Sequence, residues 1–323
     1  MREPARKLLV CAGEFYTDLI FFGLDRAPRL GEEFKTDNLV VSPGGGAGIT
    51  AAAASLLGRP TSLATVFGRC LIHPDPKEHL QAAGVATRLS RTVDEGFSGL
   101  TVAISTREDR YFVTHPGVNT RVEEYLLRPD TVHRLTTADH VHFALTPSRW
   151  QAFCAAVDDL ARAGTTVSWD LGWDPATGES GGFRHLCHTL DVLFLNEMEA
   201  RRYAGTSSTD SALKHFARPN NIVVVKQGAS GAVASQGGDT AVHATAIDIT
   251  AVETTGAGDA FNGGFLHAWM DGMPLKQALI AGNVCGGLST RSPGGWDGLP
   301  TRDEFDLEVS RIALGKAAGA KRA

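Results

Sequence analysis

Short apolar runs alternate with longer amphipathic stretches along most of the chain. Runs rich in β-branched residues, which are typical of buried strands, occupy 62–67, 140–145, 165–170, 191–196 and 221–228. Stretches rich in Ala and Leu, such as 149–164, lie between them and predict helices. Because strands that alternate with helices pair in parallel, the sequence predicts a three-layer α/β/α sandwich around a mostly parallel sheet.

Two segments depart from this alternation, at about 14–42 and 96–118. Polar and apolar residues alternate there, as in half-exposed antiparallel strands, and we expect a small β-sheet. Ligands of open α/β sheets bind beyond the carboxyl ends of the strands, so this sheet is predicted to form a lid. We expect one domain over 1–315 with these lid segments inserted, and a flexible tail at 316–323.

Composition narrows the classes of partner. The chain of 323 residues has a net charge of -5 and a charged fraction of 21%, which gives no basic face for nucleic acid. No apolar run approaches the ~20 residues of a membrane span. Its five cysteines are odd in number and form no CxxC pair, so neither a disulfide framework nor a zinc site is indicated. We therefore expect a cytoplasmic protein that binds neither nucleic acid nor membrane.

The string TTGAGDAFNGGF at 254–265 is the most informative motif. Gly256 and Gly258 allow the backbone to approach a ligand closely, and Asp259 falls in the first turn of the helix that follows. Free N–H groups in that turn form an anion site, and a carboxylate beside them can accept a proton. Taken alone, Asp259 is equally compatible with an N-cap after a glycine-rich turn.

A second glycine run, PGGGAGITAAAASLLG, occupies 43–58. Gly46, Gly48 and Ala51 fit a loose dinucleotide fingerprint, but no acidic residue follows about 20 positions on, where that fingerprint needs one. A Walker A string is also absent from the sequence. A small-residue helix packed against a strand is the structural alternative.

The string at 254–265 resembles the C-terminal signature of the ribokinase-like (PfkB) carbohydrate kinases almost letter for letter, and the run at 43–58 is similar to their N-terminal signature. The resemblance implies transfer of the γ-phosphoryl group of ATP to a sugar hydroxyl. It makes Asp259 the general base and assigns the phosphate to the amides of Gly256, Ala257 and Gly258. The substrate is expected to contact the residues Asp18, Gly45, Gly46 and Ile49.

Ile49 stands where the family usually has an Asn that binds sugar hydroxyls. Two explanations are open. Either Thr50 or a lid residue compensates, or the substrate lacks the corresponding hydroxyl.

The same resemblance assigns nucleotide-binding positions in the C-terminal half. Asn196 and Glu199 match an NxxE motif that holds Mg²⁺, largely through water. The expected contacts of the nucleotide are Asn196, Glu199, Lys226, Gly228, Gly231 and Asn283.

Two further positions differ from the family pattern. Glu253 and Thr255 lie where relatives bind an activating monovalent cation. The family usually has Asp at the position of Glu253, so K⁺ is expected as a cofactor only if the longer Glu side chain still allows the site to form. The Gly-Asp-Asp run of the family is replaced by Gly-Arg-Cys-Leu-Ile at 68–72.

Other catalytic classes find little support. His140 and His142 share one face of a predicted strand without a third ligand at a suggestive spacing, and no G-x-S-x-G string occurs. The sequence thus favours a sugar kinase that uses ATP and Mg²⁺ and that forms a homodimer through its lid. A nucleoside kinase of the same fold and a catalytically weak sugar- or nucleotide-sensing protein are the alternatives.

Overall fold

The computed structural model describes residues 6–72, 75–106 and 110–320. Its main sheet has the strand order β14-β13-β12-β11-β10-β9-β1-β4. The strands from β4 to β12 pair in parallel, and β13 and β14 are antiparallel additions at one edge. Their bounds are β1 Leu9–Gly13, β4 Thr61–Ala64, β9 His140–Ala144, β10 Thr166–Asp170, β11 Val192–Asn196, β12 Ile222–Lys226, β13 Ala232–Gln236 and β14 Val242–Ala244.

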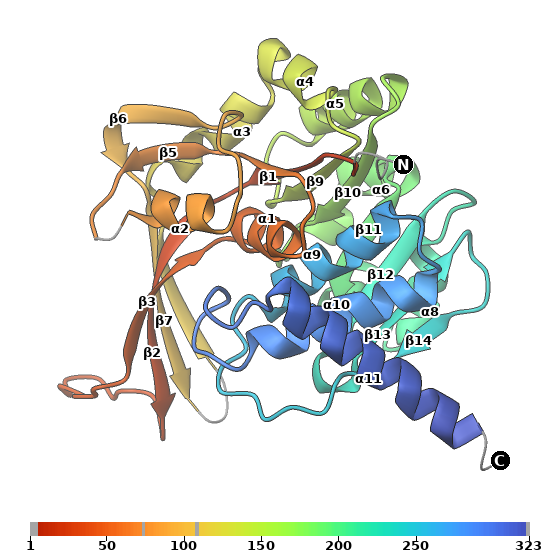
Figure 1. The fold of residues 1–323 in the computed structure, drawn as a ribbon. Coiled ribbons are helices and arrows are strands. Elements are labelled where there is room, and N and C mark those ends of the chain that lie inside the picture. The colour runs from red at the N-terminus through yellow and green to blue at the C-terminus, as the bar shows by residue number, and fades with distance from the viewer. Residues whose placement is uncertain (1–5, 73–74, 107–109, 321–323) are drawn as a thin grey trace.

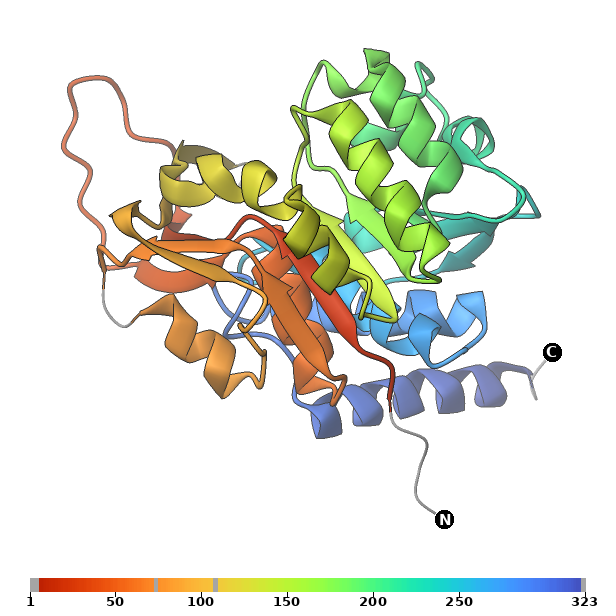
Figure 2. The same ribbon diagram turned by 90° about the horizontal axis from the view of Figure 1, so that it is seen from above.

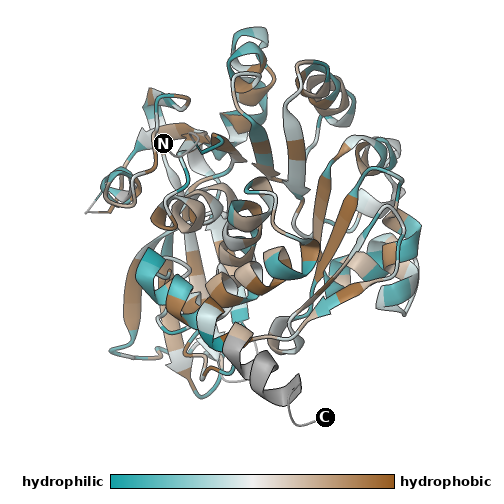
Figure 3. Cartoon of the chain, turned by 45° about the vertical axis from the view of Figure 1, so that its right-hand side comes forward, coloured by the Kyte–Doolittle hydropathy of each residue, from teal (hydrophilic) through white to brown (hydrophobic). Residues whose placement is uncertain are grey.

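Helices cover both faces of this sheet (Figures 1 and 2). Successive residues of a strand point to opposite faces, and Leu9 and Cys11 accordingly join one apolar core while Val10 and Ala12 join the other. The helices α1 Gly46–Leu56, α9 Ala257–Met270 and α10 Leu275–Ser289 pack on the first face, and α5 Trp150–Arg162, α6 Gly181–Thr189 and α8 Thr209–Phe216 on the second. The predicted α/β/α sandwich is confirmed, and the strands are its most continuously apolar part (Figure 3).

A separate four-stranded sheet has the order β3-β2-β7-β8 and lies beside α1 (Figure 1). Its strands are β2 Tyr16–Leu24, β3 Leu39–Gly44, β7 Gly99–Thr106 and β8 Arg110–His115. They fall within the two segments that the sequence marks as exceptions, except that β3 runs two residues past the first of them, and 107–109 lie outside the described residues. The pairing between β2 and β7 is parallel, not antiparallel as expected, because the chain returns to the main sheet between them.

Two further strands, β5 Val66–Arg69 and β6 Arg91–Phe97, form a parallel pair. The remaining helices are α2 Pro76–Ala82, α3 Val122–Leu126, α4 Pro129–Leu135, α7 Glu197–Tyr203 and α11 Arg302–Ala320. The last of these continues through 316–320, which the sequence analysis assigns to a flexible tail, because Ala-rich segments favour helix. None of the helices in the described ranges is both long and apolar enough to cross a membrane.

Candidate active site

Asp259 lies in the first turn of α9, as its motif predicts. Gly256 precedes the helix in a left-handed conformation with φ of 74°. A Cβ at Gly256 would come within 2.7 Å of the Gly295 Cα and of the Ile49 side chain. Both the backbone angle and the lack of space therefore require glycine here. The N–H groups in the first turn of a helix have no i→i−4 partner within it. Here the Ala257 N–H donates to the Thr254 carbonyl oxygen at 3.3 Å and the Asp259 N–H donates to the Gly256 carbonyl oxygen at 3.1 Å, both in the loop before α9.

The glycine run that enters α1 lies against two carboxyl groups. A Cβ on Gly44 would overlap the carboxyl of Asp18, which comes from β2, and a Cβ on Gly46 would lie 3.0 Å from the Asp259 Oδ1 atom. Gly45 has φ of 88°, and a Cβ there would lie 2.5 Å from the Glu14 carbonyl oxygen. The structure thus brings Asp18, Gly45, Gly46 and Asp259 together from segments far apart in the sequence.

Both carboxyl groups have a raised pKa. Burial raises the pKa of Asp18 to about 7, with a further contribution from the negative charge of Asp259. Burial also raises the pKa of Asp259 to about 7, and the charge of Asp170 adds to the effect while Lys226 opposes it. A carboxylate that titrates near neutrality is well matched to proton transfer at physiological pH.

Ile49 is almost completely buried. Its side chain is 2% exposed, and its Cδ1 atom lies beneath Gly256 and Gly295, where a Cβ on either glycine would come within 2.8 Å of it. It therefore supports the loop before α9 and presents almost no surface to a substrate. Its neighbour Thr50 donates from Oγ1 to the Asp259 carbonyl oxygen at 3.0 Å, which ties α1 to α9.

Lys226, at the end of β12, is held by two residues that the sequence analysis did not select. Its Nζ atom forms a buried ion pair with Asp170, the last residue of β10, and donates to Asn262 Oδ1 at 3.3 Å. Asn262 Nδ2 in turn donates to Asp170 Oδ2 at 2.7 Å. Nζ also lies 3.5 Å from the Gly258 carbonyl oxygen. A positive charge is thereby fixed beneath the first turn of α9.

The network holds both Asp170 and Lys226 in their charged forms. Burial acts against ionisation of Asp170, but the charge of Lys226 and the hydrogen bonds from Lys226 and Asn262 bring the pKa of this carboxyl below its usual range. Burial likewise acts against the charge of Lys226, but the Asp170 carboxylate outweighs it and raises the lysine pKa. Both groups are therefore ionised at neutral pH.

Asn196 and Glu199 form a capping box at the start of α7. Asn196 Oδ1 accepts from the Glu199 N–H at 2.8 Å, and Glu199 Oε2 accepts from the Asn196 N–H at 2.9 Å. Burial raises the pKa of Glu199 to about 7, and the neighbouring charge of Asp170 raises it further. The neighbouring carboxyl groups of Glu199 and Asp170 would suit a hydrated divalent cation.

The other predicted nucleotide positions occupy turns and one helix. Gly228 and Gly231 have positive φ values of 56° and 97° and form a tight turn closed by the Gly231 N–H, which donates to the Gly228 carbonyl at 2.9 Å. Asn283, on α10, donates to the carbonyl oxygens of Ala244 and Thr245 at 2.9 and 3.0 Å. Its amide group therefore fastens the end of β14 to α10.

Glu253 has a crowded carboxylate. Oε1 accepts from the Thr255 N–H at 2.9 Å and from Thr255 Oγ1 at 2.7 Å, and Oε2 accepts from the Gly294 N–H at 3.2 Å. Ser105 and Arg110 approach from the small sheet, with Arg110 Nη1 3.9 Å from Oε1. Because donors and a guanidinium already surround this carboxylate, the residues present do not fit a K⁺ ion here.

The histidines in the main sheet are structural. His140 bonds to Thr166 and Ser168, and His142 bonds to Ser168, at distances from 2.7 to 2.8 Å. Burial lowers the pKa of both rings, so they are neutral. Within the described part of the chain, no cluster of three His, Cys, Asp or Glu side chains is arranged to hold a metal directly.

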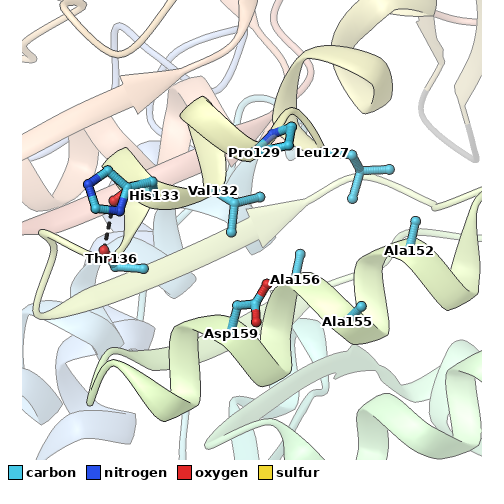
Figure 4. Close-up of a pocket in the computed structure, with 9 residues that line it drawn as sticks. All are labelled: Leu127, Pro129, Val132, His133, Thr136, Ala152, Ala155, Ala156 and Asp159. Atoms are coloured by element: carbon cyan, nitrogen blue, oxygen red, sulfur yellow. Dashed lines mark hydrogen bonds between the residues drawn. The ribbon is translucent and has the colours of Figure 1, made fainter.

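A cavity of about 420 Å³ lies elsewhere, between α4 and α5 (Figure 4). Its walls are mainly apolar and include Val132, Ala155 and Ala156, with Asp159 at one side. None of the residues that the sequence analysis selects lines it. The candidate site around Asp259, at the start of α9, is therefore separate from this cavity.

Comparisons with known proteins agree with this geometry. The model of the pfkB family of carbohydrate kinases matches residues 6–302. An ATP-dependent ribose-1-phosphate kinase from Halopiger xanaduensis is 30% identical over 290 residues, which cover 87% of this chain and 90% of the relative.

Two solved structures share the fold. A nucleoside kinase from Methanocaldococcus jannaschii has a TM-score of 0.79 at 19% identity and covers 95% of this chain and 100% of its own. The Arabidopsis thaliana ribokinase complexed with ribose and ATP has a TM-score of 0.77 at 21% identity and covers 95% and 99%.

The chain therefore belongs to the pfkB family of carbohydrate kinases and has the ribokinase-like fold. It is a phosphotransferase whose acceptor is an alcohol group of a carbohydrate.

Proposed function

We propose that this kinase transfers the γ-phosphoryl group of ATP to a hydroxyl of a small carbohydrate, with Asp259 as the general base. The observation that carries the proposal is the position of Asp259. Its carboxyl lies at the amino-terminal end of α9, against Gly46 of the run that also contacts Asp18. A hydroxyl bound there meets a proton acceptor and an anion site at once.

The substrate would be oriented by Asp18 and by the backbone of Gly45 and Gly46. A carboxylate accepts two hydroxyl donors at once, so Asp18 suits a diol. Thr101 and Thr114 lie beside Asp18 in the small sheet, since Thr101 pairs with both residues. Their hydroxyl groups lie 3.2 Å apart and would supply the hydrogen bonds that Ile49 does not make, which favours compensation by a lid residue.

The nucleotide would lie along the turn at Gly228 and Gly231, with its phosphates directed at Gly256, Ala257 and Gly258. Lys226 would offset phosphate charge from below. Mg²⁺, held through water near Glu199, would supply the further positive charge that phosphoryl transfer requires. Asn196 and Asn283 would act on the nucleotide indirectly, through the capping box and through the attachment of β14.

Two further assignments accompany this function. The edge strand β8 exposes Tyr111, Phe112 and Val113 by 50 to 70%, and an exposed apolar edge invites pairing with a second copy, so we infer a homodimer through the small sheet. A monomeric mass by light scattering would refute the dimer.

All five cysteines are unpaired, which supports a reducing, cytoplasmic location.

The decisive experiment measures ADP release from Mg-ATP over a panel of ketoses, aldoses, sugar phosphates including ribose 1-phosphate, and nucleosides. Turnover with one sugar, abolished by Asp259→Asn, establishes the proposal. Turnover with nucleosides alone assigns the chain to nucleoside kinases. Binding without turnover over the whole panel identifies a sensing protein.

A further inference from the structure

A second cavity, of about 250 Å³, lies between β6 and α3, at the upper left of Figure 1. One wall is β6, and the other is the end of the 3-10 helix η1 Gly117–Arg121 followed by α3. Among the described residues, the lining contains three arginines, Arg91, Arg121 and Arg128, against a single acidic residue, Glu124. The chain as a whole has a net charge of -5, so this concentration of positive charge is local.

Two of these arginines have no partner in the part of the chain that the structure describes. The side chains of Arg91 and Arg121 are exposed, and no ion pair or side-chain hydrogen bond engages either guanidinium there. Arg128 pairs with Asp130 on its own segment, with Nε 3.0 Å from Oδ1, and stays 46% exposed. Each guanidinium has five N–H donors in a planar fork that matches the oxygens of a phosphate group. The cavity therefore offers both donors and positive charge to an anion.

The floor of the cavity is apolar and firmly held. Val66, at the start of β5, is 2% exposed, and Tyr125, on α3, is 7% exposed. The Tyr125 hydroxyl donates to the Leu89 carbonyl oxygen, and the Arg91 N–H donates to the Thr65 carbonyl oxygen at 2.9 Å. The organic part of a small anion can pack against this floor while its charged oxygens meet the guanidinium groups.

Both walls continue directly into the small sheet. Ser98 alone separates β6 from β7, and Pro116 alone separates β8 from η1. The walls meet at this end, because a Cβ on Gly117 would overlap the Phe97 carbonyl oxygen. The chain therefore enters β7 and leaves β8 past the same cavity.

The η1 wall is also attached to the strand that carries Asp18. Asn119 Oδ1 accepts from the Phe15 N–H at 3.3 Å, and Asn119 Nδ2 donates to the Phe15 carbonyl oxygen at 2.9 Å. Phe15 immediately precedes β2, where Asp18 pairs with Thr101 of β7. A ligand that draws β6 and η1 together would thus act on both β2 and β7.

We propose that this cavity binds a phosphate monoester, and that the bound ester fixes the separation of β6 and η1 and with it the position of the small sheet. The effect on the sugar site rests on the proposed function. A phosphate dianion accepts hydrogen bonds from Arg91 and Arg121 together and so bridges the two walls. Free phosphate shares this chemistry, but only an ester also covers the apolar floor, so the ester is expected to bind more tightly.

The test of binding is calorimetry on the full chain with glycerol 2-phosphate as the ester and inorganic phosphate as the free ion. Saturating Mg-AMP-PNP is present, so that the phosphate loop is filled. Arg91→Gln and Arg121→Gln should each weaken binding of the ester by about ten-fold or more. Glu124→Gln removes the acidic residue of the lining and should strengthen it. Arg184→Gln, at an exposed arginine of α6 outside the cavity, is the matched control and should leave it unchanged.

Hydrogen–deuterium exchange measures the effect on the small sheet. The ester should slow exchange of the amide groups of β7 and β8 in wild type but not in Arg121→Gln. By linkage, the ester and the sugar should change each other's affinity by the same factor. Binding without any change in exchange would refute the coupling.

Three results would overturn the site itself. One is equal affinity of wild type and both arginine variants, which would place the ester elsewhere. Another is the lack of binding of either phosphate compound at millimolar concentration. Tighter binding of free phosphate than of the ester would refute the assignment of an ester.

These measurements do not depend on turnover. If the protein phosphorylates no sugar, yet the ester protects β7 and β8 through Arg121, the proposed function fails and the assignment of the cavity stands. If sugar is phosphorylated but neither the ester nor free phosphate binds, the proposed function stands and the assignment of the cavity is refuted.

Discussion

Lys226 Nζ and the Asp170 carboxylate form a buried ion pair directly beneath the first turn of α9, with Asn262 completing the network. The pair joins the ends of two strands that are not neighbours in the sheet, since β11 lies between them. It therefore fixes a positive charge 3.5 Å from the Gly258 carbonyl oxygen.

Removing one partner of the pair should destabilise the fold more than removing both. Lys226→Met leaves a buried carboxylate unpaired, for which a loss of about 3–5 kcal/mol in unfolding free energy is expected. The double variant Lys226→Met, Asp170→Asn leaves no such charge and should recover most of that loss. Denaturant unfolding of the two variants measures the difference. Equal stability of the single and double variants would contradict an intact ion pair in the native state.

Replacement of the two aspartates at the substrate site should have different kinetic effects. Asp259→Asn removes the proton acceptor, so kcat should fall by about 10²–10⁴ while the sugar still binds. Asp18→Asn removes a substrate contact and should chiefly raise KM. Steady-state kinetics with titration calorimetry for sugar binding provides the comparison. A normal kcat in Asp259→Asn would exclude this residue as the base.

The pH dependence of the rate should reflect the raised pKa of Asp259. The base must be ionised to accept the proton, so kcat/KM should fall as pH drops below about 7. An acid limb near pH 4, typical of an unperturbed carboxyl, would show that burial does not control this group. Rates should be measured at constant ionic strength from pH 5 to 9.

The same pKa predicts an effect on stability. A carboxyl whose pKa is higher in the folded protein than in the unfolded chain stabilises the fold at low pH, and this contribution is lost as pH rises through the folded value. Above that pH the folded protein carries the free-energy cost of a buried, ionised Asp259 carboxylate, and Asp259→Asn removes this cost. Its Tm should therefore exceed that of wild type at pH 8, and the difference should shrink at pH 5. A difference that does not vary with pH would indicate another cause.

Glycine is required at position 46 because of its neighbours, not its backbone angle. A Cβ there would lie 3.0 Å from Asp259 Oδ1 and 3.2 Å from the Ala144 Cβ, so Gly46→Ala should lower kcat/KM by about ten-fold or more through misplacement of the base. Gly181→Ala is the matched control, because Gly181 also begins a helix and has open space around it. Equal activity of the two variants would argue against close packing at Gly46.

Several parts of this structure follow from sequence pattern alone. The alternation of apolar runs predicts the parallel sheet. The two glycine-rich motifs single out Asp259, Gly45 and Gly46 as candidates, and the structure brings these residues together. Ile49 shows the limit of such reasoning. The sequence suggests a substrate contact, but the side chain is buried beneath Gly256 and Gly295.

Asp170, Asn262 and Arg110 escaped the sequence analysis for a common reason. Each acts through a partner from a distant segment, and single positions of Asp, Asn or Arg at the end of a strand or on a helix are too frequent to stand out. Asp170 and Lys226 both end strands of a parallel sheet, whose carboxyl ends meet at one edge. That shared position was the available signal.

The attachment of α1 to α9 divides the reacting groups into two bodies. Thr50 bonds to the backbone of Asp259, and a Cβ on Gly263 would lie 2.6 Å from the Ala53 Cβ, so the glycine run, the phosphate loop and the base move as one unit. Asp18 belongs to the small sheet, on β2. Any displacement of that sheet relative to α1 and α9 would therefore change the distance between an acceptor bound at Asp18 and the Asp259 carboxyl, so the position of the sheet sets whether the base can reach the acceptor.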